Sequence, residues 1–156
     1  MAVSRQRKED GIVDVLNSIL EIELAGVVRY MHYSLMIFGY SRIPIVKWMR
    51  EQAEESLVHA AAAGEHITAL GGHPSLRIGK LLETSHHDID HILREAMEHE
   101  REGVALYRKL LDLVKDRNIA LEEYARAMVA GEETHINAIE KMLRHPEALD
   151  PRSGRS

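Results

Sequence analysis

Four long stretches of the sequence repeat apolar residues at the three- and four-residue spacing of an α-helix, and few glycines or prolines interrupt them. The spacing predicts helices over about residues 9–38, 44–70, 85–115 and 119–144. Pro44 suits the first turn of the second helix, and Pro146 stops the fourth. Helices on the order of 40 Å long bury their apolar stripes by packing as an antiparallel bundle. The chain is therefore expected to be all-α.

The connections between these helices predict their order in space. The short first and third connections join neighbouring helices as hairpins. The middle one, about residues 71–85, is rich in turn residues and long enough to cross from one end of the bundle to the other. Two hairpins joined by one long crossover resemble the ferritin-like bundle. We expect one domain over residues 1–156, with the bundle at about 9–144, a polar tail at 145–156 and no fifth helix.

Composition excludes several classes of protein. The 156 residues include no cysteine, which excludes disulfides and thiolate metal sites. A net charge of −5 argues against a surface that binds nucleic acid throughout. No apolar run approaches the roughly 20 residues that span a bilayer, and the polar start does not resemble a signal peptide. We expect a cytoplasmic protein without a membrane partner.

Each predicted apolar stripe carries a carboxylate near its middle, and two stripes add a histidine. The six residues are Glu23, Glu55, His59, Glu100, Glu132 and His135. Four ionised carboxylates at one height inside a bundle would repel one another and lose their hydration. Two divalent cations would balance their charge, and such an oxygen-rich ligand set favours iron or manganese over structural zinc. The alternative is that these groups are hydrogen-bonded core residues without a metal.

The two histidines have different neighbours. In 132-EETH-135, glutamate and histidine are three residues apart, a spacing that turns both toward one metal. Three residues before His59 stands Ser56, whereas Glu55 stands four residues before it. A four-residue step also keeps two side chains on one face of a helix. Because Glu55 continues the stripe through Trp48 and Gln52, we expect it to be the ligand.

Several segments resemble the bacterioferritins, over about residues 10–144. They are 22-IELAGVVRYMHYSLM-36, 55-ESLVHA-60, 67-ITALGGHPSL-76, 100-EREG-103 and 132-EETH-135. The resemblance implies a di-iron ferroxidase centre with two irons per subunit, for which manganese or zinc can substitute. It matches ligand positions at Glu23, His59, Glu100, Glu132 and His135, and it puts Ser56 where the family has a further glutamate. Tyr30 matches a tyrosine beside the site, where it hydrogen-bonds a carboxylate or gives up an electron, unless it only packs.

The sequence departs from that family at two further points. Leu57 stands where the family's haem-binding methionine would be, so we do not expect haem. Pro146 and Pro151 leave no room for the family's short fifth helix. This resembles the Dps-like mini-ferritins, so a homo-oligomeric shell of either 12 or 24 subunits is expected.

The expected function is a ferroxidase and iron-storage or detoxification subunit that oxidises Fe²⁺ with O₂ or H₂O₂. One alternative is a rubrerythrin-like peroxide reductase, and another is a DNA-protecting or scaffolding shell. Only Arg5, Arg7 and Lys8 favour contact with DNA, and a solvated terminus accounts for them as well. The cluster 86-HHDIDH-91 is expected to be an exposed first helical turn rather than an iron-entry site. His66 is expected to pack.

Overall fold

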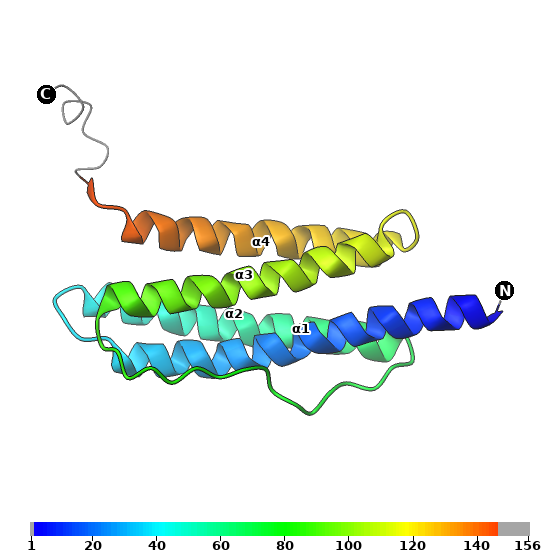
Figure 1. Cartoon of the computed structure of the whole chain (residues 1–156), viewed down its shortest axis with the longest axis horizontal. Coiled ribbons are helices and arrows are strands. Elements are labelled where there is room, and N and C mark those ends of the chain that lie inside the picture. Colours follow the sequence, from blue (N-terminus) through cyan, green and yellow to red (C-terminus); the bar gives the residue numbers. More distant parts are fainter. Residues whose placement is uncertain (1, 147–156) are drawn as a thin grey trace, which may run out of the picture.

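The computed structural model describes residues 2–146, whose helices form a bundle of two hairpins (Figure 1). The helices of this part of the chain are α1 (Ala2–Met36), α2 (Arg42–Ala69), α3 (Ile89–Val114) and α4 (Ile119–Leu143). α1 pairs with α2, α3 pairs with α4, and α1 also contacts α3. The long crossover lies along α1 and returns the chain to the end where α2 began, so α2 and α3 run in the same direction (Figure 1). The predicted fold class is confirmed.

Two helix starts differ from the prediction. α1 begins at Ala2 rather than near Glu9, since no proline interrupts the polar start. α3 begins at Ile89 rather than near Ser85. Ser85 has a φ of +58°, outside the right-handed helical region, and the Asp88 side chain caps α3 by accepting a hydrogen bond from the His91 backbone N–H at 3.0 Å.

Polar contacts hold the crossover against α1. The Asn17 side chain donates to the His73 carbonyl at 3.1 Å and accepts from the Ser75 backbone N–H at 2.7 Å. The Gly79 N–H donates to the Glu21 carbonyl at 2.7 Å, and a Cβ at residue 79 would lie only 2.9 Å from that oxygen. A glycine is therefore required where the crossover meets the helix backbone.

The apolar core has two clusters, one on each side of the middle of the bundle. One contains Leu16, Ile19 and Leu110, and the other contains Ile37, Met49 and Leu93. The polar residues predicted to bind metal lie between them along the bundle. Among residues 2–146, none of the helices combines the length and apolar composition that a bilayer crossing requires.

The buried face of α2 is turned by one residue from the predicted stripe. Its buried residues are Val46, Met49, Gln52, Ala53, Ser56, Ala60, Ala63 and Ile67. Glu55 and His59 of the predicted stripe are half-buried instead. One residue corresponds to about 100° of rotation around a helix. Ser56 therefore faces the centre of the bundle, and Glu55 lies at the edge of the buried face.

The polar tail lies almost wholly outside the described residues. Residues 147–156 are not among the described residues, and neither are the side chains of Arg5, Arg7 and Lys8. The predicted absence of a fifth helix, the contact with DNA and the extent of the domain over all 156 residues stay predictions.

Candidate metal centre

Three buried carboxylates from three helices meet at the middle of the bundle. Glu23 of α1, Glu100 of α3 and Glu132 of α4 are only 6%, 6% and 5% exposed. His59 of α2 and His135 of α4 lie beside them and are half-buried. The chain therefore places five of the six predicted ligands together, contributed by all four helices.

Glu132 lies between the two imidazoles. One of its oxygens is 3.1 Å from His59 Nδ1, and the other is 3.3 Å from His135 Nδ1. Glu23 approaches the same nitrogen of His59 at 3.4 Å, and Glu100 approaches that of His135 at 3.8 Å. This arrangement makes two groups of three residues that share Glu132, and within each group the donor atoms lie within 4.8 Å of one another.

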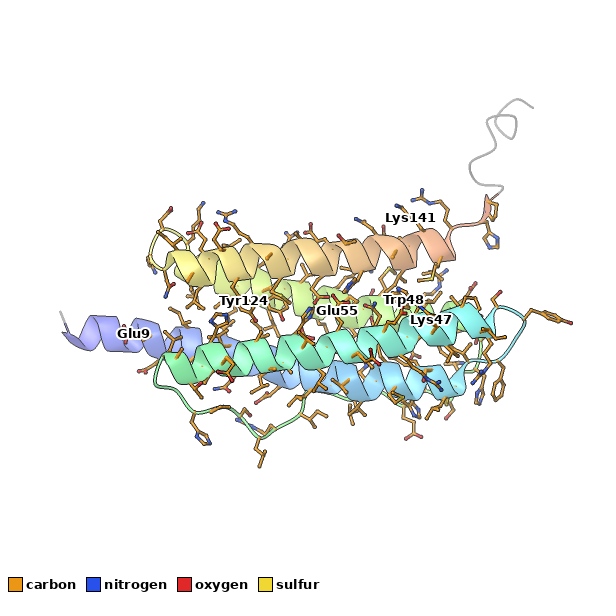
Figure 2. The ribbon with its side chains drawn as sticks, turned by 180° about the vertical axis from the view of Figure 1, so that it is seen from behind. Glu9, Lys47, Trp48, Glu55, Tyr124 and Lys141 are labelled. Atoms are coloured by element: carbon orange, nitrogen blue, oxygen red, sulfur yellow. The ribbon has the colours of Figure 1, made fainter. Side chains whose placement is uncertain are left out.

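Glu55 lies on the opposite side of the imidazole rings. Its two oxygens are 3.7 Å from His59 Nε2 and 3.2 Å from His135 Nε2, and its side chain is 43% exposed. Figure 2 shows Glu55 midway along α2, on the side toward the α3–α4 hairpin. The Nδ1 atoms thus face the buried carboxylates while the Nε2 atoms face Glu55. In metal sites, a carboxylate in this position orients the histidine ligands from outside.

Two tyrosines hydrogen-bond to Glu23 and Glu100, the two carboxylates that are not shared between the ligand groups. The Tyr30 hydroxyl of α1 donates to Glu100 of α3. In the same way, the Tyr107 hydroxyl of α3 donates to Glu23 of α1 at 2.6 Å. Tyr107 was not among the predicted site residues. The signal for it was present in the sequence, since Tyr107 follows Glu100 by the same seven positions that separate Tyr30 from Glu23.

The histidines balance the charge of the carboxylates when no metal is bound. Burial by itself lowers the pKa of His59, but polar contacts with Glu132 and Glu23 outweigh it and raise the pKa to about 10. The pKa of His135 is likewise lowered by burial and raised more strongly by Glu100 and Glu132, to about 10. Both rings are therefore positively charged imidazolium groups at neutral pH, and each must release the proton on its metal-binding nitrogen when a metal binds.

The pKa values of Glu100 and Glu132 shift in opposite directions. Burial is the largest influence on the pKa of Glu100 and raises it. Burial also raises the pKa of Glu132, but its contacts with His135 and His59 prevail and leave that pKa lowered. Of these two carboxylates, Glu132, the shared residue, is thus the one that stays negative more readily.

The donor set fits two metal ions. His59 Nδ1 is buried and close to two carboxylates, yet it makes no hydrogen bond of good geometry. Such an atom is explained by a cation placed between it and the oxygens. Three carboxylates with two imidazoles suit hard or borderline divalent ions such as Fe²⁺ and Mn²⁺. Glu132, with one oxygen in each group, can bridge the pair.

Comparison with known proteins identifies the family of the chain. The sequence matches the family described as ferritin-like domain over residues 13–149. The chain belongs to the ferritin-like domain family. It is 25% identical to the bacterioferritin of Desulfovibrio desulfuricans over 153 residues, which cover 96% of this chain and 83% of that one.

Solved structures share the ferritin-like bundle. A ferritin-like diiron-carboxylate protein from Bacillus anthracis str. Ames superposes with a TM-score of 0.83 at 22% identity, over 88% of this chain and 98% of its own. A dodecameric thioferritin, the bacterioferritin-related protein of Bacteroides fragilis, superposes with a TM-score of 0.80 at 21% identity. The match covers 86% of this chain and 85% of that one. At these identities the likeness establishes the fold.

A buried arginine and histidine adjoin the candidate metal centre and were not predicted. Arg29 donates to His99 Nδ1 at 3.1 Å and to the Tyr33 hydroxyl at 2.9 Å. Burial and the neighbouring guanidinium lower the pKa of His99 to about 4, so its ring is neutral. His99 lines a small cavity together with Ser56 and the three buried carboxylates. No local pattern pointed to this pair, because its partners are 70 residues apart.

The remaining histidine groups lie away from the centre. His86, Asp88 and His91 lie close enough to one another to hold a metal ion, but all three are exposed, and Asp88 caps α3. His66 packs against Tyr124 with ring centroids 4.3 Å apart, as expected. Leu57, which stands where the bacterioferritins have a haem-binding methionine, is 56% exposed.

Proposed function

We propose that this protein is a ferroxidase and iron-storage or detoxification subunit whose substrate is Fe²⁺. The position of Glu132 carries the proposal, because its two oxygens each face one imidazole and so join two ligand groups. A pair of Fe²⁺ ions supplies two electrons, which reduce O₂ to H₂O₂ or H₂O₂ to water. Carboxylates, as hard anions, favour the Fe³⁺ product.

Each side chain of the centre has a role in this proposal. Glu23 with His59, and Glu100 with His135, would each hold one Fe²⁺, and Glu132 would bridge the pair. Both histidines would bind through Nδ1 after losing a proton, leaving each Nε2–H to donate toward Glu55. We therefore propose that Glu55 orients the histidines, in place of the ligand role predicted for it.

The two tyrosines would keep the terminal carboxylates in place. Tyr30 of α1 donates to Glu100 of α3, and Tyr107 of α3 donates to Glu23 of α1. Each carboxylate therefore has one oxygen held by a tyrosine of the other hairpin. A carboxylate held in this way loses little freedom when iron binds. Tyr30 keeps its predicted catalytic role here as a phenol beside the iron ligands.

We further propose that the subunit works in the cytoplasm as part of a homo-oligomeric shell of 12 or 24 copies. A structural relative is a dodecamer. α1 also exposes Val28, Met31 and Leu35, which lie on one face at helical spacing. An apolar face of this kind favours contact with another subunit.

Iron uptake by the whole protein tests the proposal. Fe²⁺ is added without oxygen, then O₂ or H₂O₂ is mixed in, and Fe³⁺ is followed by ultraviolet absorbance. Iron retained per subunit is counted after size-exclusion chromatography. Storage predicts many irons per subunit, whereas a peroxide reductase would retain about two and a scaffold none. Absence of rapid oxidation with either oxidant would reject a ferroxidase.

A further inference from the structure

Ser56 opens a small cavity in the middle of the candidate metal centre. The Ser56 side chain is buried, and the cavity is also lined by Glu23, Glu100 and Glu132. Its volume is about 10 Å³, roughly the space that one water-sized molecule needs. Neither His59 nor His135 lines it. The cavity therefore lies on the carboxylate side of the centre, away from the imidazoles.

The hydrogen-bonding state of His99, on the wall of this cavity, is set by Arg29. A guanidinium can only donate, so His99 Nδ1 must accept the hydrogen bond from Arg29 at 3.1 Å. The neutral ring then carries its hydrogen on Nε2. His99 is thereby held as a hydrogen-bond donor through Nε2.

Gly26 of α1 leaves room for this donor beside Ser56. A Cβ at residue 26 would lie 3.0 Å from His99 Nε2 and 2.8 Å from Ser56 Oγ. The two polar atoms thus flank the same glycine, one from α3 and one from α2. The Ser56 hydroxyl and the His99 N–H thus add two hydrogen-bond donors to a cavity whose other charged or polar lining groups are the three carboxylates. These are the donors that an anion requires.

The charge of the centre calls for such an anion. Two divalent ions bring four positive charges, whereas the three buried carboxylates bring three negative ones. Glu55 adds a fourth from behind the imidazole rings, but it is half-buried and screened by water. One positive charge inside the bundle is left without a ligand of opposite sign in direct contact.

We propose that this cavity binds one exogenous anion of the size of hydroxide, held between the two metal groups by the Ser56 hydroxyl and the His99 Nε2–H. The proposal rests on the proposed function, since it requires two bound metal ions. It assigns Ser56 and His99 as binding residues and Arg29 as the positioning residue that fixes the tautomer of His99. Fluoride, a single atom close to hydroxide in size, is the probe.

Fluoride binding to the Co²⁺-loaded protein tests the proposal. Co²⁺ is first titrated to two per subunit, and fluoride is then followed by the visible absorption bands of Co²⁺. The expected result is saturable binding that Ser56→Glu weakens at least tenfold, because the new carboxylate occupies the cavity and neutralises the charge. Leu57→Glu adds the same charge at the next, exposed position and is expected to leave binding within about threefold of wild type.

Two variants of His99 test the donor separately. His99→Phe removes the N–H and is expected to weaken fluoride binding about tenfold, the usual effect of losing a hydrogen bond to a charged group. His99→Gln offers an amide donor and is expected to recover most of that loss. A merely structural role for His99 would not distinguish these two variants.

Three results would overturn the inference. A wild-type protein that holds two Co²⁺ but no fluoride rejects the anion position while leaving the proposed function intact. Equal binding by wild type and Ser56→Glu rejects the position of the anion. Fewer than two Co²⁺ per subunit rejects the proposed function itself, and the anion position with it.

Discussion

The α1–α2 hairpin and the α3–α4 hairpin contribute similar residues to the centre but differ just before the histidine of the second helix. Each hairpin supplies a glutamate, a tyrosine seven residues after it and a histidine on its second helix. The tyrosine of each hairpin binds the glutamate of the other. Three positions before the histidine stands Glu132 in α4 but Ser56 in α2, and four positions before it stands Gly131 in α4 but Glu55 in α2.

This difference separates two roles within the centre. The matched residues place and orient ligands, and they do so with approximate two-fold symmetry. The difference between Glu132 and Ser56 sets the charge of the buried ligands, because α4 supplies a carboxylate shared by both groups and α2 does not. Where α2 would supply a second one, Ser56 leaves a cavity.

Removing both ligands that α4 contributes is expected to have the largest effect. Glu132→Ala combined with His135→Ala takes away the bridging carboxylate and one imidazole, and it should slow Fe²⁺ oxidation at least about 100-fold. Helix content by circular dichroism should not change. Glu133→Ala is the matched control, because Glu133 pairs with Arg108 at the surface. Unchanged oxidation in the double variant would remove the site assignment.

Metal-free stability is expected to fall as pH rises, with one histidine of each hairpin responsible. The folded pKa values of His59 and His135 are about 10, above the ordinary value of 6.5. Stabilisation by the two imidazolium groups is therefore complete below about pH 6.5 and is lost as pH rises through about 10.

Thermal unfolding in the presence of a chelator, measured between pH 6 and 10, checks this. His59→Gln and His135→Gln should each flatten part of the slope, and equal parts would support the two-fold symmetry. A melting temperature that is constant across this range contradicts the assigned charge state.

Ser56→Glu makes α2 resemble α4 at the position where the two differ. Without metal, a fourth buried carboxylate should destabilise the fold by about 1–3 kcal/mol, which lowers the melting temperature by several degrees. With Mn²⁺ or Co²⁺ the added ligand should raise metal affinity, so the metal-dependent gain in melting temperature should exceed that of wild type. A variant with the same metal-free stability as wild type would show that residue 56 does not face the carboxylates.

Removing either tyrosine hydroxyl is expected to have the smallest effect. Tyr30→Phe and Tyr107→Phe each delete one hydrogen bond to a carboxylate, which should cost about 1–2 kcal/mol of stability. Oxidation should slow by a similar factor in both variants if the hairpins are equivalent. Tyr40→Phe, at a fully exposed tyrosine, is the control. A much larger loss of oxidation in Tyr30→Phe would indicate that Tyr30 alone takes part in electron transfer.

Local sequence patterns determined most of this structure. The helical periodicity and the glycine and proline breaks predicted four helices and the crossover, because each helix must bury one stripe and each connection must suit its length. Carboxylates within those stripes identified Glu23, Glu100 and Glu132, since a buried charge needs a partner wherever the helix lies.

The packing of the helices against one another selects the residues that complete the centre. Packing turns α2 so that the small residues Ala53, Ala60 and Ala63 are buried, and that rotation brings Ser56 inside and moves Glu55 to the far side of the imidazoles. The Tyr107–Glu23 and Arg29–His99 hydrogen bonds join residues 84 and 70 positions apart. A helix's periodicity specifies which residues share a face, but the direction of that face within one turn depends on the neighbouring helices.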